Sequence, residues 1–342
     1  MLTERMKRFI REIPKGENHI HIEGSIPAKT AIKLAKRNHV KLPFDTEQGM
    51  YDYIRANVVD LNSFMRCDRL INSTCVNEED YYEVIYALGQ NAHEQNIIYQ
   101  ELHLDYPLNE IRGIPIDVVM KGYDAGRKMV KKDFGVEITF IAGLDRSLSP
   151  ESCLNFVKEF EPYLYMIDGI GMDCEEKGHP CIKHKASYDL ATQMGLFKTA
   201  HAGEDDGAQN IWDAIDVLGC ARIDHGVRAI DDEKLIDYLV EKQILLAMCT
   251  RSNIHCKLFP SLAGHAIKPL MERGVLCSIS SDDPPYVGDL ICEFEGVADE
   301  IGFTEDQLIT LARNSLQYSI NGQHLLPKFD AWVADWKALP TN

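Results

Sequence analysis

The chain has 342 residues, of which 45% are hydrophobic, and its formal net charge at pH 7 is -17. A chain of this length can bury a large core and falls within the size range of one α/β barrel with insertions. Its acidic excess, without any cluster of basic residues, argues against a nucleic-acid partner, because binding to phosphates needs a basic face. The composition favours a small substrate that is neutral or weakly charged.

The N-terminal segment MLTERMKRFIREIPK carries a charge every few residues and predicts a short helix that ends near Pro14. It lacks the apolar stretch of a secretory leader. Nowhere does an apolar run approach the ~18 residues that a membrane-spanning helix needs, so we expect no membrane partner. The ten cysteines are scattered and form no C-x-x-C pair, which is typical of free thiols in a reducing cytoplasm.

Short β-type runs then alternate with segments of helical periodicity, such as 117–132 and 231–242. This alternation predicts βαβ crossovers and a parallel sheet. Eight such runs predict a closed (β/α)₈ barrel, a TIM barrel in the α/β class, in preference to an open sheet. The expected strands are residues 18–22, 97–104, 136–142, 165–172, 198–202, 222–225, 244–249 and 275–280.

More than seventy residues separate the first two expected strands, far more than one crossover helix needs. We expect a single barrel domain over residues 1–342, with a helical insertion at about 24–96 that covers the active site like a lid. Beyond the eighth strand we expect extra C-terminal helices, one of them from 304 through 320, and then a polar tail. The helices expected within the insertion are 27–38, 50–55, 61–72 and 78–95.

His19 and His21 stand two residues apart in the first expected strand. Because side chains alternate across a strand, both rings can point to the barrel interior. Imidazoles are poor core residues, since their nitrogens need partners, but they are good metal ligands. The pair alone is weak evidence, because such pairs also occur by chance on surfaces.

Three further motifs follow the ends of later strands. His201 and Glu204 follow the fifth strand, and His225 ends the sixth. The adjacent carboxylates Asp282 and Asp283 follow the eighth, where they would repel each other without a cation or donors nearby. Taken singly, these motifs are equally consistent with a strand-end turn, a core histidine and a solvated loop.

Together the motifs place three histidines and one carboxylate at the mouth of the barrel, where active sites of this fold form. This donor set, His19, His21, His201 and Asp282, suits one Zn²⁺ per chain with an open position for water. Zinc would lower the pKa of that water toward ~7. Glu204 would then transfer protons and His225 would orient the water.

The same segments resemble the adenosine/adenine deaminase family of the metal-dependent amidohydrolases. The motifs that carry the resemblance are HIHIEGS (19–25), HAGE (201–204), RIDHGVR (222–228), SN (252–253) and SDDP (281–284). The resemblance implies that the four residues above ligate one zinc and that Glu204 protonates purine N1. It further implies that His225 positions the attacking water and that Asp283 accepts a hydrogen bond around N7.

Two acidic positions resemble the members that deaminate free adenine to hypoxanthine and ammonia. Nucleoside deaminases of the family carry Asp where this chain has Glu23, and the segment 171–180 is similar to the adenine-specific members. Glu176 in that segment would accept the N9–H that adenine has and a nucleoside lacks. Adenosine, a modified adenine, or a purine with an acidic group paired to Arg251 all stay open as substrates.

Two rival interpretations have different consequences. Binuclear amidohydrolases also begin with H-x-H, but they use a lysine at the end of strand four, and residues 169–173 contain none. A non-catalytic binding relative would be expected to have lost a ligand or the acid, and all these positions are intact. We therefore expect a cytoplasmic enzyme of purine metabolism with a small-molecule partner, while homo-oligomerisation stays open.

Overall fold

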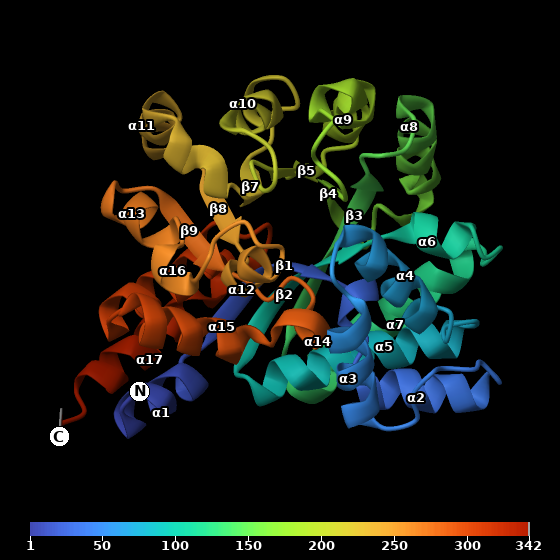
Figure 1. Ribbon diagram of the computed structural model, residues 1–342, viewed down its shortest axis with the longest axis horizontal. Helices are drawn as coiled ribbons and strands as arrows, with labels where there is room; N and C mark the ends of the chain where they lie inside the picture. Colours follow the sequence, from blue (N-terminus) through green and yellow to red (C-terminus); the bar gives the residue numbers. More distant parts are fainter. Residues whose placement is uncertain (341–342) are drawn as a thin grey trace.

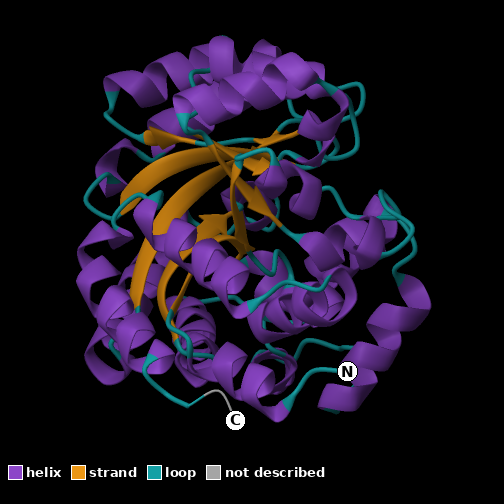
Figure 2. Cartoon of the chain, turned by 90° about the vertical axis from the view of Figure 1, so that its left-hand side faces the viewer, coloured by secondary structure: helices purple, strands orange, loops and turns teal. Residues whose placement is uncertain are grey.

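The computed structural model describes residues 1–340, and there parallel strands form a ring surrounded by helices (Figure 1). Figure 2 shows the strands curving inside this helical shell. One arc of the ring runs β1 (Lys15–His21), β2 (Ile97–Leu104), β3 (Glu137–Asp145), β4 (Ile167–Asp173) and β5 (Phe197–Lys198). The other arc runs β6 (His201–Ala202), β7 (Arg222–His225), β8 (Leu245–Met248) and β9 (Leu276–Ile279).

The ring closes where β1 meets the end of β9. Ile20 and Asp282 form a parallel bridge, and the His21 N–H donates to the Asp282 carbonyl at 3.0 Å. The strands are buried along most of their length, as expected for a parallel sheet covered by helices. The predicted (β/α)₈ barrel is confirmed.

The fifth predicted strand, 198–202, is divided into β5 and β6. Thr199 still donates to the Ile170 carbonyl of β4 at 3.0 Å, whereas the Ala200 carbonyl accepts from Asp224 of β7 at 2.9 Å. The backbone thus exchanges one neighbouring strand for the other at this point, which interrupts regular pairing. The strand occupies a single position in the barrel despite the interruption.

Helices follow the strands around the ring, as the alternating pattern predicts. None of the helices within residues 1–340 is both long and apolar enough to cross a membrane. The outer helices are α7 (Ile116–Phe134), α8 (Pro150–Glu159), α9 (Lys185–Gln193), α10 (Ala208–Asp216), α11 (Glu233–Lys242), α13 (Ile267–Glu272) and α16 (Glu305–Gln317). Shorter ones lie in the loops: α6 (Tyr106–Glu110), α12 (Thr250–His255), α14 (Pro284–Val287) and α15 (Leu290–Gly296).

The insertion after β1 is helical at the predicted places. Capping boxes at Asp60 and Asn77 begin its last two helices. The last of them packs closely on α7, where a Cβ on Gly122 would lie 2.5 Å from the Glu78 carbonyl oxygen. The helices are α2 (Ala28–Arg37), α3 (Glu47–Asn57), α4 (Leu61–Asn72) and α5 (Glu78–Glu94).

The expected polar tail after residue 320 is wrong, because α17 (Leu326–Lys337) forms there. Phe329, Trp332 and Trp336 recur at helical spacing and make an apolar stripe that the charged residues between them obscure in the sequence. Trp336 packs against Phe9 of α1 (Glu4–Glu12), with ring centroids 5.3 Å apart. Both ends of the chain consequently lie on the same side of the molecule (Figure 1).

The barrel interior below the mouth, which we call the floor, is polar and fully buried. The Arg222 guanidinium forms an ion pair with Glu101, donates to Asp224 Oδ1 at 3.1 Å, and donates to the Asn18 carbonyl at 3.0 Å. Each of these charged side chains is 0% exposed. Because every charge has a partner of opposite sign, the group satisfies the requirement for burying ions in a core.

Candidate active site

Four metal-binding side chains converge at the mouth of the barrel. The Nε2 atoms of His19 and His21 lie 3.0 and 3.2 Å from the Nε2 atom of His201. Asp282 Oδ1 lies 3.3 Å from His19 Nε2 and 3.5 Å from His21 Nε2. Donor atoms around a tetrahedral zinc are separated by about 3.4 Å, given metal–ligand distances near 2.1 Å. These residues therefore fit a metal ion of this size without rearrangement.

The outer nitrogens of two of these imidazoles are held by other groups. His21 Nδ1 lies 3.3 Å from Asp105 Oδ2, and His19 Nδ1 lies 3.4 Å from the Ala247 carbonyl oxygen. Both partners accept hydrogen bonds, so each Nδ1 carries the hydrogen and each Nε2 offers its lone pair to a metal. The carbonyl and the carboxylate thus set the tautomers that metal binding needs.

Backbone conformation aims two of the site residues. His225 and Asp282 have φ of 63° and 61°, in the left-handed region that few residues other than Gly adopt. His225 ends β7 and Asp282 follows β9, and at both points the chain turns away from the barrel. The turn directs the two side chains back over the mouth, at a backbone cost of the kind that concentrates in functional sites.

A cavity of about 710 Å³ opens above the metal-binding residues. Its apolar side comes from the insertion and from α14, where Phe64 packs on Tyr286 with ring centroids 4.7 Å apart. The predicted site residues that line this cavity are His21, Glu23, Glu176, His201, Glu204, His225, Asp282 and Asp283. The insertion therefore walls the site, while its movement as a lid stays a prediction.

Glu204 and His225 face each other across the metal-binding group. Glu204 Oε1 lies 3.6 Å from His225 Nε2, which lies 3.9 Å from Asp282 Oδ2. Burial, and then the charge of Asp282, raise the pKa of Glu204 well above its ordinary value. Burial, followed by the charge of His19, lowers the pKa of His225 to about 3. These shifts favour a protonated carboxyl group on Glu204 and a neutral imidazole on His225.

Asp283 lies against Gly24 at the edge of the cavity. A Cβ on Gly24 would lie 1.7 Å from Asp283 Oδ1, so any other residue at position 24 would displace the Asp283 carboxyl group. Oδ1 is buried and has no hydrogen-bond partner among residues 1–340. Burial and the neighbouring Asp282 raise the pKa of Asp283 well above its ordinary value. The raised pKa favours the neutral carboxyl group, which can donate a hydrogen bond to a ligand.

Glu23 connects the first two strands beneath the cavity wall. Its Oε1 accepts from the Tyr123 hydroxyl at 3.0 Å, and its Oε2 accepts from the Asp105 N–H at 3.1 Å. Burial, and then the charge of Asp105, raise the pKa of Glu23 to about 8. Glu23 thus lines the cavity as expected, and its contact with a substrate stays a prediction.

Glu176 makes contacts that the sequence did not suggest. Its carboxylate accepts the backbone N–H groups of Gly203, Glu204, Asp205 and Asp206, at 2.6, 2.9, 3.1 and 3.2 Å. Oε2 therefore accepts three of these N–H groups and Oε1 one, and the contact of Glu176 with purine N9–H stays a prediction. Through these bonds Glu176 holds the loop that carries Glu204.

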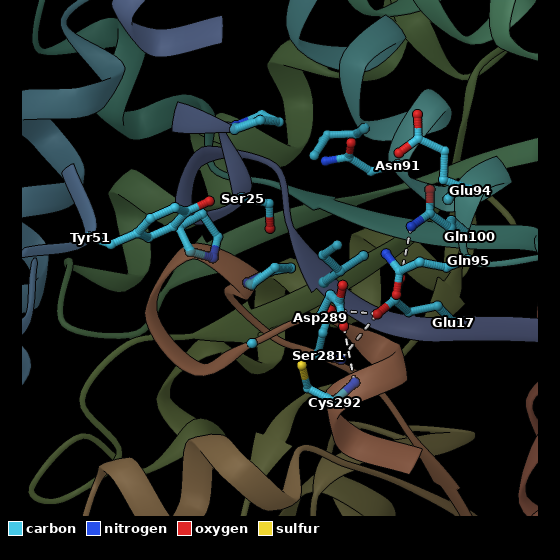
Figure 3. Close-up of a pocket in the computed structure, with 17 residues that line it drawn as sticks. Glu17, Ser25, Tyr51, Asn91, Glu94, Gln95, Gln100, Ser281, Asp289 and Cys292 are labelled. Carbon is cyan, nitrogen blue, oxygen red and sulfur yellow. Dashed lines mark hydrogen bonds between the residues drawn. The ribbon is translucent and has the colours of Figure 1, made fainter. Parts of the chain in front are cut away.

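A second buried carboxylate, that of Glu17, holds the loop that carries Asp282. Glu17 Oε1 accepts the N–H of Ser281 at 3.1 Å and the Ser281 hydroxyl at 2.5 Å, and its Oε2 accepts from Gln100 at 2.7 Å. Figure 3 shows this group at the wall of a separate pocket between β1 and the segment that leads to α15. Since Ser281 precedes Asp282, Glu17 fixes the position of a metal-binding residue.

Sequence reasoning missed Asp173, which ends β4 within ligand distance of His21 and Asp105. Its place at a strand end was the available signal. His103 of β2 packs beside His19. Arg251, by contrast, donates to the Val287 carbonyl at 2.6 Å and is not among the described residues that line the cavity. The alternative in which Arg251 pairs with an acidic group of the substrate is therefore unsupported.

Residues 14–324 match the family model described as adenosine deaminase. The chain is 36% identical over 315 residues to an adenine deaminase of Crocosphaera subtropica, covering 92% of this chain and 96% of that protein. It is 34% identical over 312 residues to an adenine deaminase of Pseudomonas putida, covering 91% of this chain and 98% of that protein.

Solved structures give the same picture. The crystal structure of an adenine deaminase from Arthrobacter aurescens superposes with a TM-score of 0.89 at 30% identity, covering 94% of this chain and 99% of that one. An amidohydrolase from Burkholderia ambifaria, solved with bound Zn, has a TM-score of 0.88 at 22% identity, covering 99% and 96%. The second likeness supports the fold alone.

Proposed function

Because the chain belongs to the adenosine deaminase family, we propose that it is a zinc-dependent aminohydrolase that converts adenine and water to hypoxanthine and ammonia. The observation that carries this proposal is the convergence of His19, His21, His201 and Asp282 beside Glu204 and Asp283 in one cavity. The two relatives from Crocosphaera subtropica and Pseudomonas putida are named adenine deaminases. One metal per chain is proposed, because a single convergent set of three imidazoles and a carboxylate serves it.

A zinc ion held by these four residues would lower the pKa of a bound water and make it nucleophilic at neutral pH. Glu204, protonated as its raised pKa favours, donates its hydrogen to purine N1. This proton transfer withdraws electrons from C6 and prepares it for attack. After the water oxygen adds to C6, one proton of the water returns to Glu204 and the other moves to the amino group, which leaves as ammonia while C6 becomes a carbonyl.

Two further residues orient the reactants. His225, neutral as its lowered pKa favours, faces Glu204. It therefore hydrogen-bonds the attacking water without taking the proton of Glu204. Asp283 lines the same cavity and would contact the purine around N7. Because N7 of adenine carries a lone pair and no hydrogen, we propose that the Asp283 carboxyl group donates to it, and this reverses the direction of the bond expected from the resemblance.

The charge of the cavity favours a base over a nucleotide. Around it the described residues supply many acidic side chains and, as cations, Arg69 and Lys257. A phosphate group would be repelled by those acidic side chains that are ionised, whereas free adenine carries no charge. The acidic side chains are Glu23, Asp60, Asp68, Asp105, Asp145, Asp173, Glu175, Glu176, Glu204, Asp205, Asp282 and Asp283.

Substituted adenines are a second candidate substrate class. The cavity of about 710 Å³ lies in the range that holds drug-sized ligands, so it has room beyond a purine base. The extra wall is apolar, with Val58, Phe64 and Met65 from the insertion. An apolar substituent on the purine would bury surface there.

The test is ammonia release by the zinc-loaded protein from adenine, N6-methyladenine, adenosine and AMP, with methylamine followed for the methylated base. We expect the highest kcat/KM with adenine and the lowest with AMP. Chelation should abolish the activity and added zinc should restore it. Release of ammonia from none of the four compounds would overturn the proposed function, and preference for N6-methyladenine would establish the second candidate.

A further inference from the structure

A row of hydrogen bonds runs from the backbone of α13 to the ring of His225. The Ile267 N–H donates to His265 Nδ1 at 3.1 Å. His265 Nε2 lies 3.0 Å from Asn253 Oδ1, and Asn253 Nδ2 lies 3.2 Å from His225 Nδ1. All three side chains are at most 2% exposed, so water does not compete for these bonds.

The direction of the row is set at its first bond. A backbone N–H can only donate, so His265 Nδ1 must be the acceptor and carries no hydrogen. Burial lowers the pKa of His265 to about 4, which keeps the ring neutral. In a neutral imidazole the hydrogen must then be on Nε2, where it is donated to Asn253.

The amide of Asn253 passes this direction on. Its oxygen accepts from His265, so its NH₂ group faces His225. An amide NH₂ donates and does not accept, which makes His225 Nδ1 an acceptor without hydrogen. The hydrogen of the neutral His225 ring is consequently on Nε2, the atom that lies 3.6 Å from Glu204 Oε1.

We infer that His265 and Asn253 are positioning residues that fix His225 in the tautomer with hydrogen on Nε2. The inference rests on the proposed function, in which His225 donates to the oxygen that attacks C6. With the other tautomer, Nε2 would present a lone pair to that oxygen and would compete with Glu204 for its hydrogen. His265 thus acts on the reaction through His225, although it is not among the described residues that line the cavity.

Packing supports the same role. The His265 ring lies against Phe259, with centroids 4.7 Å apart and an interplanar angle of 50°. Contact on its face and hydrogen bonds on both nitrogens leave the ring one orientation. His265 therefore holds Asn253, and through it His225, in a fixed orientation.

The decisive variant is Asn253→Asp, which replaces the NH₂ donor by an oxygen of the same size. A carboxylate accepts from both neighbours, so it draws a hydrogen to His225 Nδ1. In protein with ¹⁵N-labelled histidine and bound zinc, we expect NMR to show hydrogen on Nε2 of His225 in the wild type and on Nδ1 in the variant. A misplaced histidine tautomer costs up to about 10⁴-fold in kcat, and we expect roughly 10²-fold here, with the KM for adenine within about 3-fold.

A matched pair at His265 keeps the inference testable if Asn253→Asp does not fold. His265→Leu removes the donor and frees the amide to rotate, so kcat should fall roughly 10-fold. His265→Gln places an NH₂ group near the former Nε2 and should recover most of that loss, because the bond to Asn253 is restored. Recovery by Gln separates the hydrogen bond from a merely structural role.

Two results would overturn the inference: hydrogen on Nδ1 of His225 in the wild-type spectrum, or wild-type kcat in a folded, zinc-loaded Asn253→Asp protein. Equal losses in His265→Leu and His265→Gln would also contradict it. If the wild-type protein releases no ammonia from any purine, the proposed function fails, while the NMR spectrum still reports the tautomer.

Discussion

The floor and the mouth of the same barrel bury polar groups in opposite ways. At the floor, Arg222, Glu101 and Asp224 are paired, each with a partner of opposite charge. At the mouth, buried atoms of His103, His201, Asp105, Asp173 and Asp283 have no hydrogen-bond partner within residues 1–340. Pairing removes the cost of burial, so the floor is built for stability, whereas unpaired groups await ligands.

The largest expected effect belongs to the mouth. Glu204→Gln keeps the shape of the side chain but removes the proton that it transfers, so kcat should fall toward ~10⁴-fold, the upper end for general acid catalysis. Metal content and thermal stability should stay unchanged. Asp206→Asn, a change on the exposed part of the same loop, is the control and should keep kcat within about 2-fold of wild type. Equal activity in the two variants would contradict the role of Glu204.

Arg222→Met tests the floor. It leaves Glu101 and Asp224 buried without their cation, so the free energy of unfolding should fall by roughly 3–5 kcal/mol, measured by urea denaturation. Arg273→Met removes a surface pair with Glu233 at 2.7 Å and should cost no more than about 1 kcal/mol. If the two variants were equally stable, the floor would not be the stabilising region that its pairing indicates.

Two substitutions of Asp283 test whether this residue donates or accepts the hydrogen bond at purine N7. Asp283→Ala removes the contact, and kcat/KM for adenine should fall roughly 10²-fold, as for loss of a bond to a group that must stay buried. Asp283→Asn keeps an N–H donor and should retain most of the activity. An Asn variant as inactive as the Ala variant would instead support the acceptor role expected from the resemblance.

Glu176→Gln should give the smallest effect. The four backbone N–H groups of residues 203–206 would lose a charged acceptor, worth ~1.5 kcal/mol at the low end for charged hydrogen bonds, or about 10-fold in kcat through a less ordered Glu204. Glu175→Gln changes the same charge on a side chain that is 58% exposed and serves as the control. If Glu176→Gln lost the preference for adenine over adenosine in kcat/KM while kcat for adenine stayed intact, the result would support the contact between Glu176 and purine N9–H.

Much of this protein followed from the sequence by itself. Strand-to-helix alternation predicted the barrel, and the helical insertion was predicted within a few residues, because period-2 and period-3.6 patterns are local. The metal-binding histidines, Glu204, His225 and the two aspartates were found by a general rule, namely that parallel strands place their C-terminal ends at one mouth. Asp282 and His19 are 263 positions apart in the chain, so no local sequence pattern predicts that they lie together, and the rule on strand ends is needed.

Only the tertiary structure decided the partners of these residues. Whether Glu176 meets a substrate or four backbone N–H groups depends on how two loops from different strands approach each other. The row from Ile267 through His265 and Asn253 to His225 likewise joins α13, α12 and β7. A hydrogen bond has short range and a direction, so its partner is fixed by packing at the scale of an ångström, which periodicity along the chain does not encode.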